Sequence, residues 1–327
     1  MKLTGIAASI CAAITFVPSA TIAQDREFSV GLITPPAHVW NKEAAAMGDT
    51  LGELSGGRFS VALFPSGQLG SEGEMLQQLQ TGALDMAWLT SGEVTTRVTD
   101  VSALHTPFLV DNIEDAARVL RSEEAREILD QMPRALGAIG VCYAMTGMRQ
   151  MMSREPLNSA ADLVGKRFRI TPAPPMRSFF EIIGAAPAPM PLTQVYDSLA
   201  NGQVDAIAMD YESIINFGYH DHAKYLLETN HQMFPMVALV SGRVWAGLSP
   251  EDQEILREGV QTHCDTTIDR FVEGEAGKFE TLKGVEGLNI TENVGMDFFE
   301  GAVADWDAQW KEQTEYVEKL RAVVAEF

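Results

Sequence analysis

Two short stretches of the chain share one pattern, and this repeat constrains the fold more than any other feature. "LQTGALDMAW" covers residues 79–88, and "LANGQVDAIA" follows 120 positions later at residues 199–208. In both, a helical pattern meets a glycine, Gly82 or Gly202, and an apolar run follows at once. Glycine adopts the left-handed backbone of a helix end without strain, and the apolar run suits a buried parallel strand. One such junction is common in α/β proteins, whereas two indicate a pair of similar lobes.

Strand-like runs and helical patterns alternate around each copy of the repeat. Runs at residues 28–33 and 59–65 precede the run at 83–90, with a helical segment in each interval. The order restarts with "KRFRI", which ends at Ile170, and reaches "VDAIAMD" after two more helical segments. The first copy closes a β-α-β-α-β order, and the chain restarts this pattern before the second copy, which is typical of an α/β layer architecture.

A long helical pattern follows the second copy and runs from about residue 250 to 283. Ser249 and Pro250 give it a good N-terminal signal. A helix of this length exceeds the usual domain helix, so we expect it to cross from one lobe to the other. The last segment, residues 298–327, is amphipathic. Ligands in open α/β sheets lie beyond the carboxyl ends of the strands, so the residues after each strand are candidates for a cleft.

The N-terminus predicts export to the periplasm. Lys2 precedes an apolar run at residues 3–17, and "TIA" before Gln24 offers a small-x-small cleavage site. This pattern is typical of a secretory signal peptide, residues 1–23. The alternative is a membrane anchor, but the run is short for a span, so we expect a protein without direct membrane insertion.

Charge and motif content exclude several classes of function. The chain carries 45 acidic against 24 basic residues, a net charge of −21, so it repels nucleic acid and anionic membranes. An anion site must therefore be built from a few local Arg or Lys side chains. No nucleophile elbow, zinc-protease, C-x-x-C or phosphate-loop motif is present. We therefore predict a protein that is not an enzyme and has neither cofactor nor metal.

Two cysteines, Cys142 and Cys264, remain after the predicted cleavage. In an exported protein they could pair as a disulfide. The alternative is two separate buried thiols that behave as small apolar residues, and we favour it. Sequence does not supply the geometry that decides.

A long stretch at residues 165–206 resembles a known family. "GKRFRITPAPPMRSFFEIIGAAPAPMPLTQVYDSLANGQVDA" is similar to the core signature of the DctP-type extracytoplasmic solute-binding proteins of TRAP (tripartite ATP-independent periplasmic) transporters. "GRFSVALFPSGQLGSEGEMLQQLQTGALDMA", "TPFL" and "NHQMFPMVALVSGRVWAGLSPEDQEIL" extend the resemblance over nearly the whole mature chain. It implies capture of a small organic acid and delivery to a TRAP membrane permease by lobe closure. A binding component for a sensor or chemoreceptor is an alternative, and a secreted α/β enzyme is a weaker one.

The resemblance also implies the architecture. We expect a two-lobed periplasmic-binding-protein fold with a cleft between the lobes, crossing strands and a long helix spanning both. The predicted first lobe takes residues 24–147 and about 233–265. The predicted second lobe takes about 148–232 and about 266–327.

Arg169 is the predicted carboxylate anchor. The resemblance implies that an Arg at the end of the "KRFRI" strand forms a bidentate pair with the ligand, and a guanidinium fork matches the two oxygens of a carboxylate. The alternative is a surface charge on an edge strand. Arg167 alternates with Arg169 along the strand and should face elsewhere. Arg149 matches a second family position, with a hinge-strand charge paired to an acid as the alternative.

One stretch departs from the family pattern. Many members carry "DGQENP", whereas this chain has "DAIAMDYES", which puts Met209 at the usual Asn position. We expect Glu212 to cap the next helix, and leave open whether Asp210 caps it, accepts from a ligand hydroxyl or ammonium, or helps to hold a cation. The departure argues against a simple dicarboxylate and for a larger acid, such as an aromatic or branched one. Further cleft candidates follow strands or lie near their ends: Tyr211, Trp40, Trp88 and Phe234, with His38 ranked below the last two.

Overall fold

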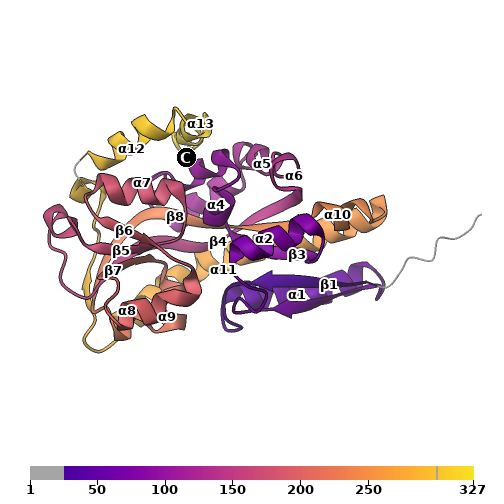
Figure 1. Cartoon of the computed structure of the whole chain (residues 1–327), viewed down its shortest axis with the longest axis horizontal. Helices are drawn as coiled ribbons and strands as arrows, with labels where there is room; N and C mark the ends of the chain where they lie inside the picture. Colours follow the sequence, from indigo (N-terminus) through magenta and orange to yellow (C-terminus); the bar gives the residue numbers. More distant parts are fainter. Residues whose placement is uncertain (1–25, 300) are drawn as a thin grey trace, which may run out of the picture.

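The computed structural model describes residues 26–299 and 301–327. The predicted signal peptide, residues 1–23, lies outside the described residues. The described strands form one nine-stranded sheet in the order β2-β1-β3-β8-β4-β7-β5-β6, with β9 paired to β8 (Figure 1). The strands are β1 (Arg26–Leu32), β2 (Phe59–Phe64), β3 (Met86–Thr90), β4 (Ala138–Ser153), β5 (Arg167–Ile170), β6 (Ala186–Pro189), β7 (Ala206–Met209), β8 (Tyr225–Ser241) and β9 (Asn289–Thr291).

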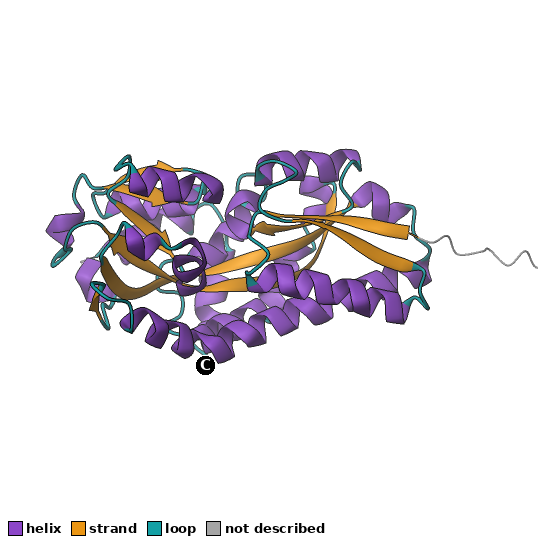
Figure 2. Ribbon diagram, turned by 90° about the horizontal axis from the view of Figure 1, so that it is seen from below, coloured by secondary structure: helices purple, strands orange, loops and turns teal. Residues whose placement is uncertain are grey.

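Helices lie on both faces of the sheet, as in other α/β layer architectures (Figure 2). The α-helices are α1 (Val39–Leu54), α2 (Glu72–Thr81), α3 (Ser91–Val94), α4 (Ile113–Leu120), α5 (Glu123–Leu129), α6 (Met132–Leu136), α7 (Pro174–Ile182), α8 (Val195–Ala200), α9 (Tyr211–Phe217), α10 (Gly242–Ala246), α11 (Pro250–Lys283), α12 (Ala302–Trp310) and α13 (Tyr316–Val324). Short 3₁₀ helices are η1 (Thr99–His105), η2 (Ala160–Leu163), η3 (Leu192–Gln194), η4 (Tyr219–Asp221) and η5 (Met296–Phe299).

The strand order is the same when read from either edge. β1 lies between β2 and β3 and is parallel to both, and β5 lies between β6 and β7 in the same way. β3 then pairs antiparallel with β8, as β7 does with β4, and β4 pairs with β8 at the centre. The first repeat unit is therefore β1-α1-β2-α2-β3, and the second is β5-α7-β6-α8-β7. This arrangement accounts for the duplicated sequence pattern.

The two glycines of the repeat have the predicted conformation. Gly82 has φ 78° and Gly202 has φ 67°, both in the left-handed region that other residues rarely adopt. A side chain at Gly202 would also approach Arg154 at 3.1 Å. Each glycine lets the chain leave its helix and enter the next strand within a few residues.

The aspartates three residues after these glycines fix the strand entries. Asp85 Oδ2 accepts from the backbone N–H of Ser29 at 2.8 Å, and its other oxygen pairs with Arg26 at 2.8 Å. Asp205 Oδ2 accepts from the backbone N–H of Arg167 at 3.0 Å, and its other oxygen pairs with the guanidinium of Arg167 at 2.5 Å. Arg167 thus faces away from the cleft, as predicted. In both units the aspartate joins its strand to the strand beside it.

Three long elements connect the two units. β4 and β8, of 16 and 17 residues, run through the centre of the sheet, and α11 has 34 residues. The bounds predicted for the long helix are confirmed, and Ser249 caps it by accepting from the backbone N–H of Asp252 at 3.1 Å. α11 packs against α1, α4, α9 and β4, so it contacts elements on both sides of the sheet centre.

The C-terminal segment forms two helices. α12 packs against α7, whereas α13 packs against α4, α5 and η1 (Figure 1). Trp306 in α12 donates to the carbonyl of Pro175 at 2.9 Å, and Arg321 in α13 donates to the carbonyl of Phe108 at 2.7 Å. The segment therefore touches both halves of the molecule, and the lobe boundaries given above stay a prediction.

The two cysteines form a disulfide, so the preference for separate thiols was wrong. Cys142 in β4 and Cys264 in α11 have Cα atoms 6.3 Å apart, within the range that a disulfide spans. Both side chains are buried. Packing of α11 against β4 brings residues 122 positions apart into bonding distance, which no sequence pattern reveals.

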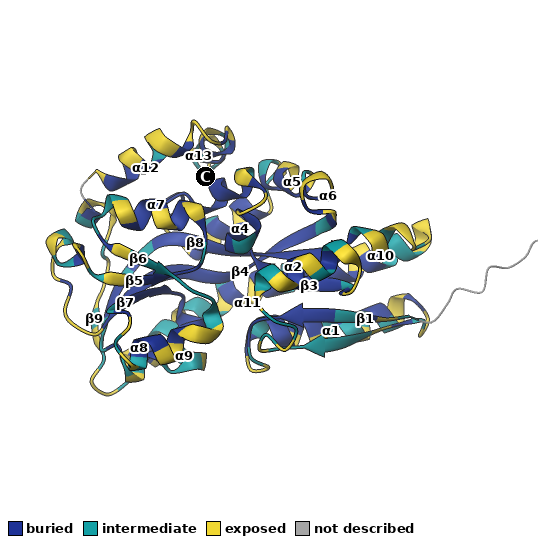
Figure 3. Ribbon diagram, in the orientation of Figure 1, coloured by how far each residue is buried: buried dark blue, intermediate teal, exposed yellow. Residues whose placement is uncertain are grey.

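Burial follows the layers. The central strands are buried along most of their length, and the outward faces of the helices are exposed (Figure 3). Between residues 26 and 327, leaving aside residue 300, no helix combines the length and the apolar character needed to cross a membrane.

Candidate functional site

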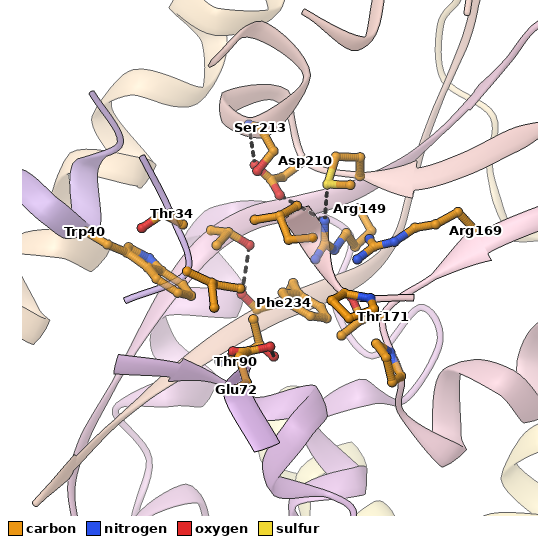
Figure 4. A pocket seen from close by; sticks show the side chains of 16 residues that line it. Thr34, Trp40, Glu72, Thr90, Arg149, Arg169, Thr171, Asp210, Ser213 and Phe234 are labelled. Atoms are coloured by element: carbon orange, nitrogen blue, oxygen red, sulfur yellow. Dashed lines mark hydrogen bonds and ion pairs between the residues drawn. The ribbon is translucent and has the colours of Figure 1, made fainter. Parts of the chain in front are cut away.

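A pocket lies beyond the carboxyl ends of the parallel strands, where the fold predicts a ligand. Both repeat units and the central strands contribute to it (Figure 4). The lining residues are Ile33, Thr34, Trp40, Glu72, Thr90, Thr146, Arg149, Arg169, Thr171, Pro172, Pro191, Leu192, Met209, Asp210, Ser213 and Phe234.

Arg169 reaches this pocket from β5 and is 2% exposed. Its Nε and Nη2 donate to the carbonyl of Met190 at 3.2 and 2.9 Å, which fixes the plane of the guanidinium. Its Nη1 has no hydrogen-bond partner, and no acid among residues 26–299 and 301–327 forms an ion pair with it. Burial, together with the charge of Arg149, lowers the pKa of Arg169 to about 10, so the group is still a cation at pH 7.

Arg149 enters the pocket from β4 beside Arg169 (Figure 4). Its Nη1 donates to Asp210 Oδ2 at 2.9 Å and contacts the sulfur of Met209 at 3.1 Å. The guanidinium carbon lies 3.6 Å from the centre of the Phe234 ring, a cation–π contact. Burial lowers the pKa of Arg149, and the charge of Asp210 offsets only part of this effect. Arg149 is therefore paired to an acid, as the alternative reading of the sequence had it, and still lines the pocket.

Asp210, rather than Glu212, caps the helix after β7. The helix starts at Tyr211, one residue earlier than expected, which puts Asp210 at the N-cap, where its Oδ1 accepts from the backbone N–H of Ser213 at 2.8 Å. Glu212 lies in the first turn, accepts from the backbone N–H of Val39 at 3.3 Å and pairs with a lysine of α11 at 3.5 Å. The expectation for Glu212 was thus wrong.

A family model for bacterial extracellular solute-binding proteins of family 7 (DctP) matches residues 30–313, most of the chain. The chain belongs to this family. The resemblance found in the sequence is thereby confirmed, and members of the family are solute-binding proteins and not enzymes.

Relatives and solved structures agree with this assignment. The sialic acid-binding periplasmic protein SiaP of Vibrio cholerae is 27% identical over 280 residues, 86% of this chain and 87% of its own. The 2,3-diketo-L-gulonate-binding periplasmic protein YiaO of Escherichia coli is 27% identical over 264 residues, 80% of each chain. A TRAP periplasmic solute-binding protein from a Bradyrhizobium species, solved with galacturonate, superposes with a TM-score of 0.86 at 28% identity and covers 92% of this chain and 100% of its own. The predicted two-lobed periplasmic-binding-protein fold is confirmed.

Glu72 is a site residue of this solute-binding protein that the sequence analysis missed. It begins α2, and its carboxylate accepts from the backbone N–H of Thr90 at 2.5 Å and from the Thr90 hydroxyl at 2.9 Å. Burial raises the pKa of Glu72 to about 7, although the bonds from Thr90 and the charge of Arg169 lower it. Glu72 stands in "SEGE", which forms a capping box between Ser71 and Glu74, so its sequence context indicates only a helix start.

The other predicted site residues divide into two groups. Trp40, Met209 and Phe234 line the pocket beside the arginines. Trp88 is fully buried in β3 outside the lining, and the ring of Tyr211 stacks on Phe279 away from it.

His38 also lies outside the lining. Its Nδ1 accepts from the backbone N–H of Trp40 at 3.1 Å and caps α1. Burial lowers the pKa of His38 to about 4 and the pKa values of His105 and His231 to about 3. These rings are neutral at pH 7 and add no charge to the site. The described residues contain no cluster of three or more His, Cys, Asp or Glu side chains arranged to hold a metal.

Proposed function

We propose that this protein captures a small hydroxylated organic acid by its carboxylate and delivers it to a TRAP membrane permease. The observation that carries the proposal is Arg169, a buried cation with a free Nη1 donor at the pocket and no acid partner among the described residues. A buried charge without a partner is costly, and a ligand carboxylate would supply both the charge and the hydrogen-bond acceptor.

The rest of the lining suits a ligand with several hydroxyl groups. Five hydroxyl side chains line the pocket, against aromatic walls from Trp40 and Phe234. The proteins cited above are named for sialic acid and 2,3-diketo-L-gulonate or were solved with galacturonate, which are all polar acids. The lining thus supports a sugar acid better than an aromatic or branched acid. The five residues are Thr34, Thr90, Thr146, Thr171 and Ser213.

The mechanism we propose is closure of the two lobes around the acid. Arg169 fixes the carboxylate from the second repeat unit, while Thr34, Trp40 and Thr90 close the pocket from the first. Closure excludes water, which strengthens the ion pair, and changes the outer surface that the permease recognises. The predicted periplasmic location fits this role. Delivery to a sensor would use the same pocket and remains the second candidate.

A thermal-shift screen tests the proposal with matched acids and sugars. D-Galacturonate and D-galactose differ at one carbon, a carboxylate against a hydroxymethyl group. A ligand at one hundred times its dissociation constant stabilises the folded state by about 2.7 kcal/mol, so a true ligand raises the melting temperature. We expect shifts from one or more sugar acids and none from their neutral sugars. Equal shifts from sugar and acid, or shifts from sugars alone, would overturn the carboxylate proposal.

A further inference from the structure

Asp210 lies in the wall of the pocket as a built-in counter-charge. The side chain of Asp210 is 1% exposed and the side chain of its partner Arg149 is 4% exposed, so water does not screen the pair. The 2.9 Å contact joins β4 to the start of α9. Of the two arginines in the pocket, one is therefore neutralised by the protein itself.

Two independent contacts hold Asp210 in place. Oδ2 accepts from Arg149, and Oδ1 accepts from the backbone N–H of Ser213 as the cap of α9. A ligand carboxylate that took Arg149 would leave Asp210 buried without its cation, a costly state for an ionised group. If Asp210 rotated away from this site, α9 would lose its N-cap, which also destabilises the fold.

Among residues 26–299 and 301–327, the charges of the pocket lining then sum to one free cation. Arg149 and Asp210 cancel, Arg169 has no acid partner within these residues, and the neighbouring histidines are neutral. Glu72, the remaining acid of the lining, is mostly protonated at about pH 6, because burial raises its pKa to about 7. One ligand carboxylate balances the pocket, whereas a second would be buried without a partner.

We propose that Asp210 determines the charge selectivity of the site, so that the pocket takes acids with one carboxylate and rejects acids with two. This inference rests on the proposed function, since it names the class of acid that the same pocket holds. Selectivity of this kind arises because the pocket carries a group that repels the wrong ligand as well as one that attracts the right ligand.

Matched pairs of acids give the probe. Galactonate and galactarate share a carbon chain and differ in a terminal hydroxymethyl or carboxylate, and erythronate and meso-tartrate differ in the same way. All carboxyl groups of the probes are ionised at about pH 6. Calorimetry on the wild-type protein should show the monoanion of a bound pair held at least about tenfold tighter than the dianion. Asp210→Asn and Asp210→Ser should lower that preference at least about tenfold, because both remove the charge and keep a good helix cap.

Asp205→Asn is the matched control. Asp205 is also an aspartate paired to an arginine in the second repeat unit, but it lies outside the pocket lining, so its loss changes the net charge equally. Its selectivity should equal that of the wild type. Circular dichroism and thermal melting check that each variant is folded. If both Asp210 variants unfold, the ratio of monoanion to dianion affinity of the wild-type protein still tests the proposal, because equal affinities would overturn it.

The outcomes separate this inference from the proposed function. If no acid of either charge binds the wild type, the proposed function fails and the selectivity inference fails with it. If a dianion binds as tightly as its monoanion, the acid-binding function stands and the role of Asp210 is overturned. A preference that survives in folded Asp210→Asn and Asp210→Ser would overturn it as well.

Discussion

The two repeat units begin in the same way and end differently. At their starts, Asp85 and Asp205 make equivalent contacts to the neighbouring strand. Five residues later, the first unit reaches Thr90, which binds Glu72 through its backbone and hydroxyl, and the second reaches Asp210, which binds Arg149. The shared part builds the fold, and the divergent ends face the pocket.

The difference assigns separate tasks to the two units. The second unit, with β4 beside it, supplies the charged groups of the pocket: Arg169, which we propose as the carboxylate anchor, and the Arg149–Asp210 ion pair. The first supplies a wall of hydroxyl and aromatic groups and one acid, Glu72, whose pKa is raised by burial to about 7, so that it is about half ionised at pH 7. A repeated scaffold thus yields an asymmetric site, because the matching strand starts hold the sheet together and the differing strand ends line the pocket.

The largest effect should separate the two arginines of β5. Arg169→Gln should weaken binding of the preferred acid by about 2–5 kcal/mol, since it removes the cation from a buried charge pair. Arg167→Gln should change affinity less than about twofold, because Arg167 is half exposed and serves the strand start. Calorimetry on both variants measures this. Similar losses from the two would mean that the strand end has no special role.

The disulfide should matter to stability but not to the ligand. Cys142–Cys264 ties β4 to α11, elements that both units share, and spans 122 positions. Replacing both cysteines by serine should lower the free energy of unfolding by about 2–4 kcal/mol. Affinity should stay within about twofold, since neither cysteine lines the pocket. Urea denaturation gives the stability, and added reductant should not change the variant further. A large loss of affinity in the folded variant would contradict this separation.

The two strand-start aspartates should differ in strength. Asp85 accepts from the backbone and hydroxyl of Ser29 and from Arg26, and its side chain is 19% exposed, against 31% for Asp205. Asp85→Asn should cost about 1–2 kcal/mol, and Asp205→Asn less than about 1 kcal/mol. Urea denaturation at pH 7 checks the order. A larger cost at Asp205 would show that burial does not set the difference.

This difference should shrink in acid. Burial raises the pKa of Asp85, but the bonds from Ser29 and Arg26 outweigh it and lower the pKa, and the bond from Arg167 lowers that of Asp205. For both, the stabilisation is present above the ordinary aspartate pKa of 3.8 and is lost as pH falls through the lowered value. The free energies of unfolding of the two variants should therefore lie closer to that of the wild type at about pH 3 than at pH 7.

The smallest effect concerns the acid of the first unit. As pH rises through about 7, Glu72 ionises and adds a negative charge near Arg169, so acid binding should weaken about threefold to tenfold between pH 6 and 8.5. Glu72→Gln should flatten this profile. Glu74→Gln is the control, because Glu74 is exposed and glutamine also serves in a capping box. An unchanged profile in Glu72→Gln would remove Glu72 from this role.

Sequence reasoning reached much of the architecture because local signals repeat. The glycine stops, the apolar strands and the capped long helix were all readable, and α11 has the predicted bounds. β6 was missed because "APAP" alternates proline, which a sheet tolerates only at an edge, and β6 is the edge strand. The C-terminal amphipathic pattern gave one segment, whereas the chain turns between residues 310 and 316 to reach two different surfaces.

The site was predictable in position and not in pairing. Arg169 was predicted from its strand end and the family pattern, Arg149 from the family pattern alone, and both line the pocket. The bond from Arg149 to Asp210 joins residues 61 positions apart, and that from Thr90 to Glu72 joins different elements of one unit. Such contacts depend on how β4 lies beside β7, and how α2 lies beside β3, which is decided by tertiary packing and not by any local pattern.

The most direct test of the central claim is a crystal structure with the tightest-binding monocarboxylic sugar acid. The ligand carboxylate should lie on the guanidinium of Arg169, with an oxygen within about 3 Å of Nη1, while Asp210 stays on Arg149. A carboxylate seated on Arg149 with Asp210 displaced, or an acid bound outside this pocket, would contradict the account.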